Sequence, residues 1–501
     1  MTYSKTFKVR YSPCVTDMTN TRVFFFVFVT IFGNCYGKTN PSVIVVGAGA
    51  AGIAATTRLL KNGIDNVIIL EAEDRIGGRV YSVKFGETYV DLGAEWCHGQ
   101  KDNVVYELVK NLNVLVSDED ATPVLIHSKL KTIKPNFTEQ LFGIFLEVYN
   151  EDRDGVNGTL GDYVSRKYRN VVENLWRNDT EELKVALDCV DLLEKIVLSY
   201  EGAFSWHSVA ADTDYVECEG DQQLAWNGRG YKTILEVLMQ KFPEPKDALP
   251  MNDKIVLNKE VNLIHWNSTV DGEEKVVVTC ADGTKYIADH VILTVSLGVL
   301  KNQHKTLIVP NLSKEKSQAV EQLGFEAVFK VVLYFEHPWW NSTFPGYSFV
   351  WDADDQDHFS EGPIKYPPFS DLKPKSWVTS IVIIMPVSGS SNALSLWFTG
   401  QFVPEIERFS DETIINGFVH LMSKFQGWID PVRPQNLTRH AWYSNPHFRG
   451  TYSYQTLEAR ADGRSKEKIL SEPIATPRGK LAVLFAGEAT HPTQFSQSMV
   501  Q

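Results

Sequence analysis

The chain has 501 residues, of which 43% are apolar and 22% charged, and its formal net charge is −13. A chain of this length exceeds one ordinary domain, and its many aromatic residues can fill large cores. The negative charge argues against a nucleic-acid partner and favours a cationic one.

The first notable element is a short apolar run, Val23–Phe32, preceded by Arg22. It is too short for a bilayer, which needs about 20 residues, so we predict no stable membrane span. A signal-peptide core fits better, with small residues near Gly37 at the cleavage site. We predict a signal peptide at 18–37, with 1–17 as an upstream extension. A buried strand or an interfacial anchor is the alternative.

Sequons and cysteines also favour export. Seven asparagines begin Asn-x-Ser/Thr: Asn136, Asn157, Asn178, Asn267, Asn311, Asn341 and Asn436. We therefore predict a secreted, extracellular and N-glycosylated protein. An oxidising compartment permits disulfides, and Cys189 with Cys218 is the predicted pair. No cysteine or histidine spacing suggests a metal site, and we read the Asp-rich stretch 352–357 as a solvated loop.

The next element is a strand, a glycine turn and a helix. Residues 43–52 read Val-Ile-Val-Val-Gly-Ala-Gly-Ala-Ala-Gly, so Gly47, Gly49 and Gly52 have the dinucleotide spacing, with Ala50 and Ala51 opening the helix. The glycines allow the turn, the approach of the backbone to a pyrophosphate and the packing of the helix on the strand. Glu71 ends the following strand, 66–70, where a carboxylate can accept ribose hydroxyls.

Two later segments indicate which dinucleotide binds. Residues 71–79 end in Gly77-Gly78-Arg79, and residues 91–99 read Asp-Leu-Gly-Ala-Glu-Trp-Cys-His-Gly. A flavin dinucleotide needs such a second close backbone approach along its longer chain, and Arg79 would supply a cation for the diphosphate. A glycine-rich turn with a solvated arginine is the alternative. We predict FAD.

Together these segments make the chain resemble the flavin-containing amine oxidases, and within them the polyamine oxidases. The resemblance extends from about residue 41 to residue 495. It rests on the 47–79 fingerprint, on 93–99, on Phe329-Lys330 and on Phe485-Ala-Gly-Glu-Ala-Thr-His491. The Gly-Ala-x-Trp-x-His-Gly form is similar to the animal spermine and acetylpolyamine oxidases, whereas plant relatives carry a carboxylate at the position of His98.

The alternation of strands and helices predicts an α/β fold. We expect helices at 183–199 and 231–242. We expect strands at 275–279, 286–295, 328–335, 377–385, 393–399 and 481–485. The resemblance implies a Rossmann-like FAD-binding domain (41–118, 216–317 and 446–501) interleaved with a mixed α+β substrate domain (119–215 and 318–445).

The resemblance also implies site residues. Gly78, Arg79, Glu95, Trp96, Cys97 and His98 would follow the flavin, Val261 would hold the adenine through its backbone, and Glu488 would reach the ribityl or diphosphate region. Trp442 would form an aromatic wall beside the flavin; core packing is the alternative. His98 would orient or deprotonate the substrate amine, unless it is a core histidine satisfied by backbone.

Lys330 is the principal catalytic candidate. It interrupts the apolar strand Ala327–Phe335, where a lysine must neutralise, pair or hold a water. The family places such a lysine opposite flavin N5. A lysine on a solvent-facing strand is the alternative.

The implied activity is FAD-dependent oxidation of polyamines such as spermine, spermidine or acetylated forms. Hydride transfer to flavin N5 and reoxidation by dioxygen would give an aldehyde, an amine and hydrogen peroxide. After Ser496 the family continues into a helix that points at the flavin, but here the sequence reads Gln-Ser-Met-Val-Gln501. We therefore also consider a secreted flavoprotein-like product that binds FAD weakly and is catalytically impaired. A third reading is an L-amino-acid oxidase or another flavin oxidase.

Overall fold

The structure is a computed structural model that describes residues 40–118, 122–213, 218–359, 376–426 and 432–491. The predicted signal peptide and the predicted consequences of the ending after Ser496 lie outside these residues. Among the helices described, none is long and apolar enough to cross a membrane.

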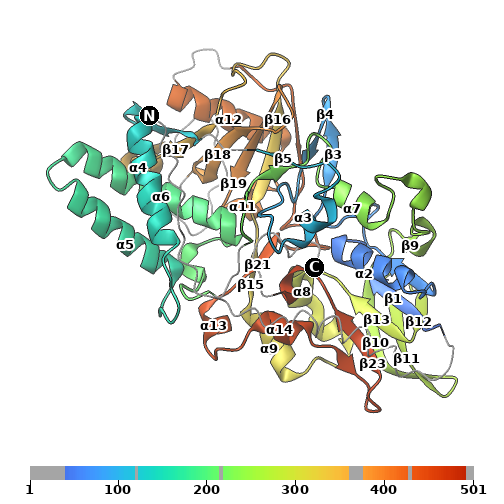
Figure 1. Cartoon of the computed structure of the whole chain (residues 1–501). Helices are drawn as coiled ribbons and strands as arrows, with labels where there is room; N and C mark the ends of the chain where they lie inside the picture. Colours follow the sequence, from blue (N-terminus) through green and yellow to red (C-terminus); the bar gives the residue numbers. More distant parts are fainter. Residues whose placement is uncertain (1–39, 119–121, 214–217, 360–375, 427–431, 492–501) are drawn as a thin grey trace. The chain divides into compact units, whose positions relative to one another are not determined.

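A six-stranded sheet contains the strand of the glycine turn. Its order is β22-β23-β13-β1-β2-β9, and β1 pairs in parallel with both β2 and β13. The four residues of β1 are β-branched and fully buried, as expected for a strand covered on both faces. Figure 1 shows helix α2 (Ala50–Lys61) beside β1. In sheet order, the strands span Ile474–Ala475, Leu481–Phe485, His290–Leu293, Val43–Val46, Val67–Leu70 and Ile255–Val256.

A four-stranded sheet adjoins this one, in the order β12-β11-β10-β14. Its long hairpin turns at Asp271 and Gly272, which both have positive φ (52° and 82°), as a two-residue type I′ turn requires. The strands span Lys285–Ala288, Glu273–Cys280, Val261–Val270 and Ile308–Val309.

A seven-stranded sheet forms the other large core, in the order β20-β16-β19-β18-β17-β6-β7. Its central strands are almost wholly apolar, and Phe329, Leu394 and Phe398 are fully buried. Helix α12 (Asp411–Gln426) packs its apolar face into the same core. The strands span Asn436–Arg439, Phe329–Tyr334, Ala393–Phe398, Ile381–Pro386, Tyr347–Val350, Val124–His127 and Lys131–Thr132.

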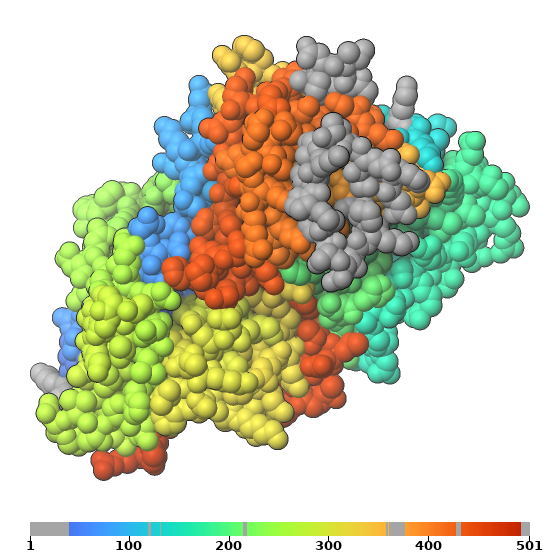
Figure 2. Space-filling model, turned by 180° about the vertical axis from the view of Figure 1, so that it is seen from behind, coloured from blue at the N-terminus to red at the C-terminus, as the bar shows by residue number. Residues whose placement is uncertain are grey.

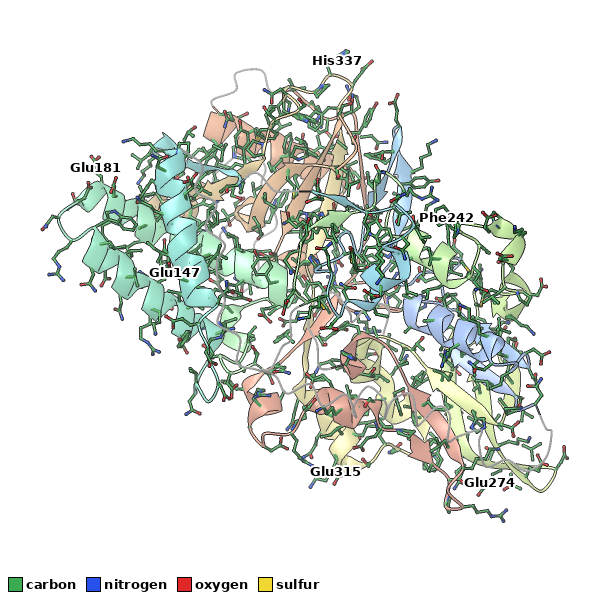
Figure 3. The ribbon with its side chains drawn as sticks, in the orientation of Figure 1. Glu147, Glu181, Phe242, Glu274, Glu315 and His337 are labelled. Atoms are coloured by element: carbon green, nitrogen blue, oxygen red, sulfur yellow. The ribbon has the colours of Figure 1, made fainter. Side chains whose placement is uncertain are left out.

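Three long helices lie together at the left of Figure 1: α4 (Pro135–Tyr149), α5 (Leu160–Leu175) and α6 (Thr180–Glu201). Asp179 caps α6 by accepting from the Glu182 N–H, and Gly202 ends the helix in the left-handed region. Glu181, labelled in Figure 3, is exposed in the first turn, where a carboxylate suits the helix dipole.

Shorter elements complete the described fold. The helices are α3 (Val104–Val109), α7 (Thr233–Leu238), α8 (Leu297–Leu307), α9 (Lys314–Gln322), α10 (Ala353–His358), α11 (Val403–Ile406), α13 (Leu457–Arg460) and α14 (Lys466–Ser471). The remaining strands are β3 (Ser82–Phe85), β4 (Thr88–Asp91), β5 (Val116–Ser117), β8 (Leu224–Ala225), β15 (Gly324–Glu326) and β21 (Tyr452–Tyr454).

Most expected elements are confirmed, with four corrections. The helix expected at 231–242 is confined to α7, and the strand expected at 286–295 breaks between β12 and β13. Residues 377–380 form a 3₁₀ turn before β18. The stretch expected as a solvated loop instead begins α10, because the buried Asp352 caps that helix. Sheet membership does not fix domain boundaries, which stay a prediction.

Candidate functional site

The glycine turn has the geometry that its spacing predicts. Gly47 has φ +105°, which disfavours any residue with a side chain. A Cβ on Gly52 would lie 1.9 Å from the Gly47 carbonyl oxygen, so only glycine lets α2 approach β1 this closely. Gly49 is the N-cap of α2 and offers no side-chain cap, which leaves the first N–H groups of the helix for an anion.

The second glycine pair joins the first. Gly77 donates its N–H to the Ala48 carbonyl at 2.8 Å and forms a parallel bridge with Gly49. The two glycine segments, 28 positions apart, therefore form one backbone surface without side chains. This is the second close approach that the sequence predicts for a long dinucleotide.

Glu71 lies at the carboxyl end of β2 and is buried. One carboxylate oxygen accepts the Ala48 N–H at 2.6 Å, and the other accepts the Glu73 N–H at 2.9 Å. Burial raises the pKa of Glu71, against the lowering effect of these two hydrogen bonds and of Arg75. Each oxygen keeps a second lone pair for a ribose hydroxyl.

A single cavity collects most of the predicted cofactor residues. Its lining includes Gly47, Gly49, Ala50, Ala51, Glu71, Gly78, Arg79, Val261 and Glu488. Sequence reasoning missed further lining residues: Thr294, Gln303, His447, Phe448 and Arg449. These arrive from distant segments, and Figure 2 shows blue atoms of the first described segment against orange atoms of the C-terminal part. The cavity wall suits a dinucleotide because it combines a bare backbone turn, a helix N-terminus and an acid at the strand end.

Arg79 and Glu488 meet across this cavity. The guanidinium lies 3.0 Å from the carboxylate, and Arg79 also donates to the Thr451 carbonyl at 2.5 Å. Ser453 donates both its backbone N–H and its hydroxyl to Glu488. The pair can orient a polar ligand chain because both side chains are held and largely buried.

The segment 91–99 contacts the Arg79 backbone and also supplies Glu95, the partner of the buried Lys330. Ala94 donates to the Arg79 carbonyl at 3.1 Å, and a Cβ on Gly93 would lie 1.9 Å from that same oxygen. Cys97 exchanges backbone hydrogen bonds with Leu224. The path of this segment is therefore fixed at both ends.

Lys330 lies where this segment passes β16. Its ammonium donates to Glu95 at 2.5 Å and to the Gly93 carbonyl at 3.1 Å, and its side chain is only 4% exposed. The solvent-facing alternative is therefore wrong. Trp397 is the partner of Lys330 on β19, and its ring centroid lies 5.0 Å from the ammonium nitrogen.

Asp91 is a second carboxylate that interacts with Lys330, in addition to Glu95. Ser82 and the Tyr231 N–H donate to it. Burial raises its pKa to about 7, although Ser82 and Lys330 act in the opposite direction. No local pattern indicated Asp91 or Trp397, because Lys330, with which both interact, is distant in the chain.

Trp96 and His98 follow Glu95, the partner of Lys330, in the chain. Trp96 stacks on Trp397 with centroids 5.7 Å apart and donates to Asp118. His98 Nδ1 is hydrogen-bonded to the Gln222 carbonyl, so Nδ1 carries the proton and Nε2 is the acceptor nitrogen. Burial lowers the pKa of His98, which favours the neutral ring.

Trp442 and Cys97 are buried. The Trp442 indole donates to the Leu92 carbonyl at 2.9 Å, and its ring packs on His440, Phe448 and the Gly93 backbone. Burial raises the pKa of the Cys97 thiol to about 12, so it is no nucleophile at neutral pH.

The predicted disulfide is wrong. Cys189 is a free thiol, as are Cys97 and Cys280, so Cys189 forms no disulfide with Cys218. Cys189 is buried in α6, in the core that this helix shares with α4 and α5. Cys218 instead lies beside Gly99, where a Cβ on the glycine would be 2.6 Å from the cysteine Cβ.

Comparison with known proteins supports the predicted chemistry. The family profile described as "Flavin containing amine oxidoreductase" matches residues 50–499. Bovine "Peroxisomal N(1)-acetyl-spermine/spermidine oxidase" is 27% identical over 493 aligned residues, covering 91% of each chain. The human protein of that name is 26% identical, again over 91% of each chain. "Probable polyamine oxidase 5" of Arabidopsis thaliana is 26% identical over 91% of this chain and 94% of its own.

The profile covers Gly52, the Gly77-Gly78 pair and both residues of the Lys330–Glu95 pair. It thus includes most of the residues that line the cavity, together with the buried cation. The chain therefore belongs to the flavin-containing amine oxidoreductases, and its cofactor is FAD.

Proposed function

We propose that this chain oxidises polyamines. When bound, FAD would accept a hydride at N5 from the carbon next to the reacting nitrogen and pass the electrons to dioxygen, giving an aldehyde, an amine and hydrogen peroxide. The observation that carries the proposal is the buried Lys330 ammonium, paired with Glu95 on the segment that also contacts Arg79. The polyamine oxidases among its relatives support the substrate class.

The protein groups of this site have distinct roles in the proposal. His98 would take a proton from the substrate nitrogen at Nε2, since its other nitrogen is hydrogen-bonded to Gln222 and its ring is neutral. The stacked rings of Trp96 and Trp397 would exclude water and offer an aromatic face to the amine chain. Lys330 would hold a positive charge where oxygen is reduced.

The cofactor would lie along the cavity. In our proposal the Gly47 turn and the start of α2 hold the diphosphate, Glu71 holds a ribose and Val261 lies at the adenine. Glu488 and Arg79 would hold the ribityl and diphosphate region. The Rossmann-like FAD-binding domain would be interleaved with the substrate domain as the sequence resemblance implies.

We also propose that the protein is secreted and N-glycosylated. All seven sequon asparagines are exposed, as glycosylation would require. The apolar run at 23–32 supports the same proposal. Expression of the full chain in a secreting eukaryotic host tests it. Glycosidase-sensitive protein in the medium supports secretion, whereas unglycosylated protein confined to the cell contradicts it.

Two assays on the purified full chain test the enzymatic proposal. One measures FAD per chain from the visible spectrum, and the other measures peroxide release with spermine, spermidine, N1-acetylspermine and a set of L-amino acids. Peroxide from the polyamines alone supports the proposal. Peroxide from amino acids alone would favour another flavin oxidase, and a chain without FAD would favour the impaired product.

Lys330→Met should lower the rate of peroxide formation by about a hundred-fold, the usual effect of losing one electrostatic group at a reaction centre. Lys167→Met is the matched control, because Lys167 is half-exposed and pairs with Glu151 on the surface. Equal rates in Lys330→Met and the wild-type chain would contradict the assigned role.

A further inference from the structure

Glu95 differs from the cofactor-lining residues in what its side chain binds. Its carboxylate lies 2.5 Å from the Lys330 ammonium, and the two side chains are 15% and 4% exposed. It does not line the cavity that collects Glu71, Arg79 and Glu488. The structure thus places Glu95 with the lysine and not with the cofactor wall.

The Glu95–Lys330 pair leaves one N–H of the Lys330 ammonium available. An ammonium has three N–H groups, and two of them are used, by Glu95 and by the Gly93 carbonyl. Within the part of the chain that the structure describes, no third acceptor is recorded for Lys330. Two fixed hydrogen bonds define the direction of the remaining N–H, which is available to a water or another ligand of the site.

The pair also stabilises the charge. A buried ammonium without a counter-charge is strongly disfavoured in an apolar strand. Trp397 offers only the modest attraction of a ring face. Glu95 is therefore the main counter-charge of the buried ammonium.

We infer that Glu95 is a positioning residue that compensates the buried charge of Lys330 and directs its remaining N–H into the reaction site. This inference rests on the proposed function for its kinetic consequence, but the pair itself does not. The backbone supports the same geometry, because the hydrogen bond from the Ala94 N–H to the Arg79 carbonyl holds the peptide whose Gly93 carbonyl Lys330 uses.

Asp91 must be included in any test by pH. Glu95 and Asp91 both interact with Lys330. Asp91 ends β4, and Glu95 follows that strand in the chain. Asp91 ionises as the pH rises and would then act as a second counter-charge. Each Glu95 variant is therefore made with and without Asp91→Asn.

The first experiment is a double-mutant cycle that needs no activity. Urea unfolding is measured on the apoprotein for wild type, Glu95→Gln, Lys330→Met and the double variant. We expect the two single effects on the unfolding equilibrium constant to be non-additive by at least about ten-fold, as for a buried charge pair. Additive effects would overturn the inference. Glu412→Gln, which removes one partner of an exposed pair, is the control and should change little.

The second experiment separates the two half-reactions in the holoenzyme. The flavin is reduced with dithionite, and its reoxidation by dioxygen is followed from about pH 6 to about pH 10. Glu95→Gln should reoxidise about ten-fold more slowly at the alkaline end and near the wild-type rate at the acid end. Glu95→Asp should restore part of the loss. A pH profile identical to that of the wild type would overturn the inference.

These experiments also distinguish the two proposals. If no polyamine reduces the flavin of the wild-type chain, the proposed function is contradicted. The dithionite experiment still tests the role of Glu95, because it needs no polyamine. If the purified chain holds no FAD, the double-mutant cycle still tests the Glu95–Lys330 pair, because it is measured on the apoprotein. Failure of the cycle with normal polyamine turnover rejects the role of Glu95 alone.

Discussion

Replacing glycine by alanine should have opposite effects on the free energy of unfolding in two helices, α4 and α2. Gly143 lies in α4 and is exposed, and a Cβ added there has no neighbour within 4 Å. Glycine inside a helix costs about 0.5–1 kcal/mol relative to alanine. Gly143→Ala should therefore raise the free energy of unfolding by about that amount and leave FAD binding unchanged.

Gly52 lies in α2, where alanine has no room. Its Cβ would lie 1.9 Å from the Gly47 carbonyl oxygen and 3.2 Å from Val45 Cγ1, against an ordinary contact of at least 3.4 Å. The carbonyl would have to move by about 1.5 Å, and it belongs to a turn already held by the Gly47 N–H to Leu70 hydrogen bond. Overpacking costs about 1–3 kcal/mol, and backbone displacement falls at the upper end of that range.

We therefore expect Gly52→Ala to lose about 2 kcal/mol or more after the gain in helix propensity. It should also lose most of its FAD, because the displaced turn is the one that would face the diphosphate in our proposal. Urea unfolding midpoints and FAD content per purified chain measure the two effects. A Gly52→Ala chain with wild-type FAD content and stability would refute the reasoning, whatever Gly143→Ala does.

Three further predictions concern titratable groups. The folded pKa of Asp91 is about 7, above its unfolded value, so native Asp91 holds a proton that the unfolded chain releases. The free energy of unfolding should fall by a few kcal/mol between about pH 4 and pH 7 through this group, and Asp91→Asn should remove that part of the slope in urea titrations. His98→Gln should lower kcat/KM for polyamines by about 10²-fold, whereas an unchanged value across the pH range would exclude a role in deprotonation. Burial raises the pKa of Cys97 to about 12 and also raises that of Cys189, so neither thiol should react with an aromatic disulfide reagent until denaturant is added; rapid reaction in the native protein would contradict their burial.

Local sequence patterns were sufficient to predict the glycine turn and the elements around it. The strand before Gly47, the helix after it and Glu71 all lie within 30 residues, and each is favoured by its own side chains. The strand at 481–485 was predicted with its observed bounds for the same reason, since it is short, apolar and flanked by turn residues.

Long-range pairings could not be read in the same way. Lys330 clearly needed a partner, but nothing in the sequence singled out Glu95, 235 positions away. Trp377 begins a short apolar run, and periodicity alone cannot tell whether such a run is a strand or a helix. In the structure residues 377–380 form a 3₁₀ turn, and the Trp377 ring packs against Gly417. The disulfide error has the same origin, because only the fold shows that Cys189 and Cys218 belong to different surroundings.

The segment 91–99 has a consequence for binding equilibria. It touches the Arg79 backbone at the cofactor cavity and supplies both acceptors of Lys330 at the other end. Occupancy of one end therefore restrains the same backbone that forms the other. Thermodynamic reciprocity then requires that any factor by which an amine tightens FAD binding also be the factor by which FAD tightens amine binding. We expect such coupling through segment 91–99, so an affinity measured for either ligand should be reported with the occupancy of the other.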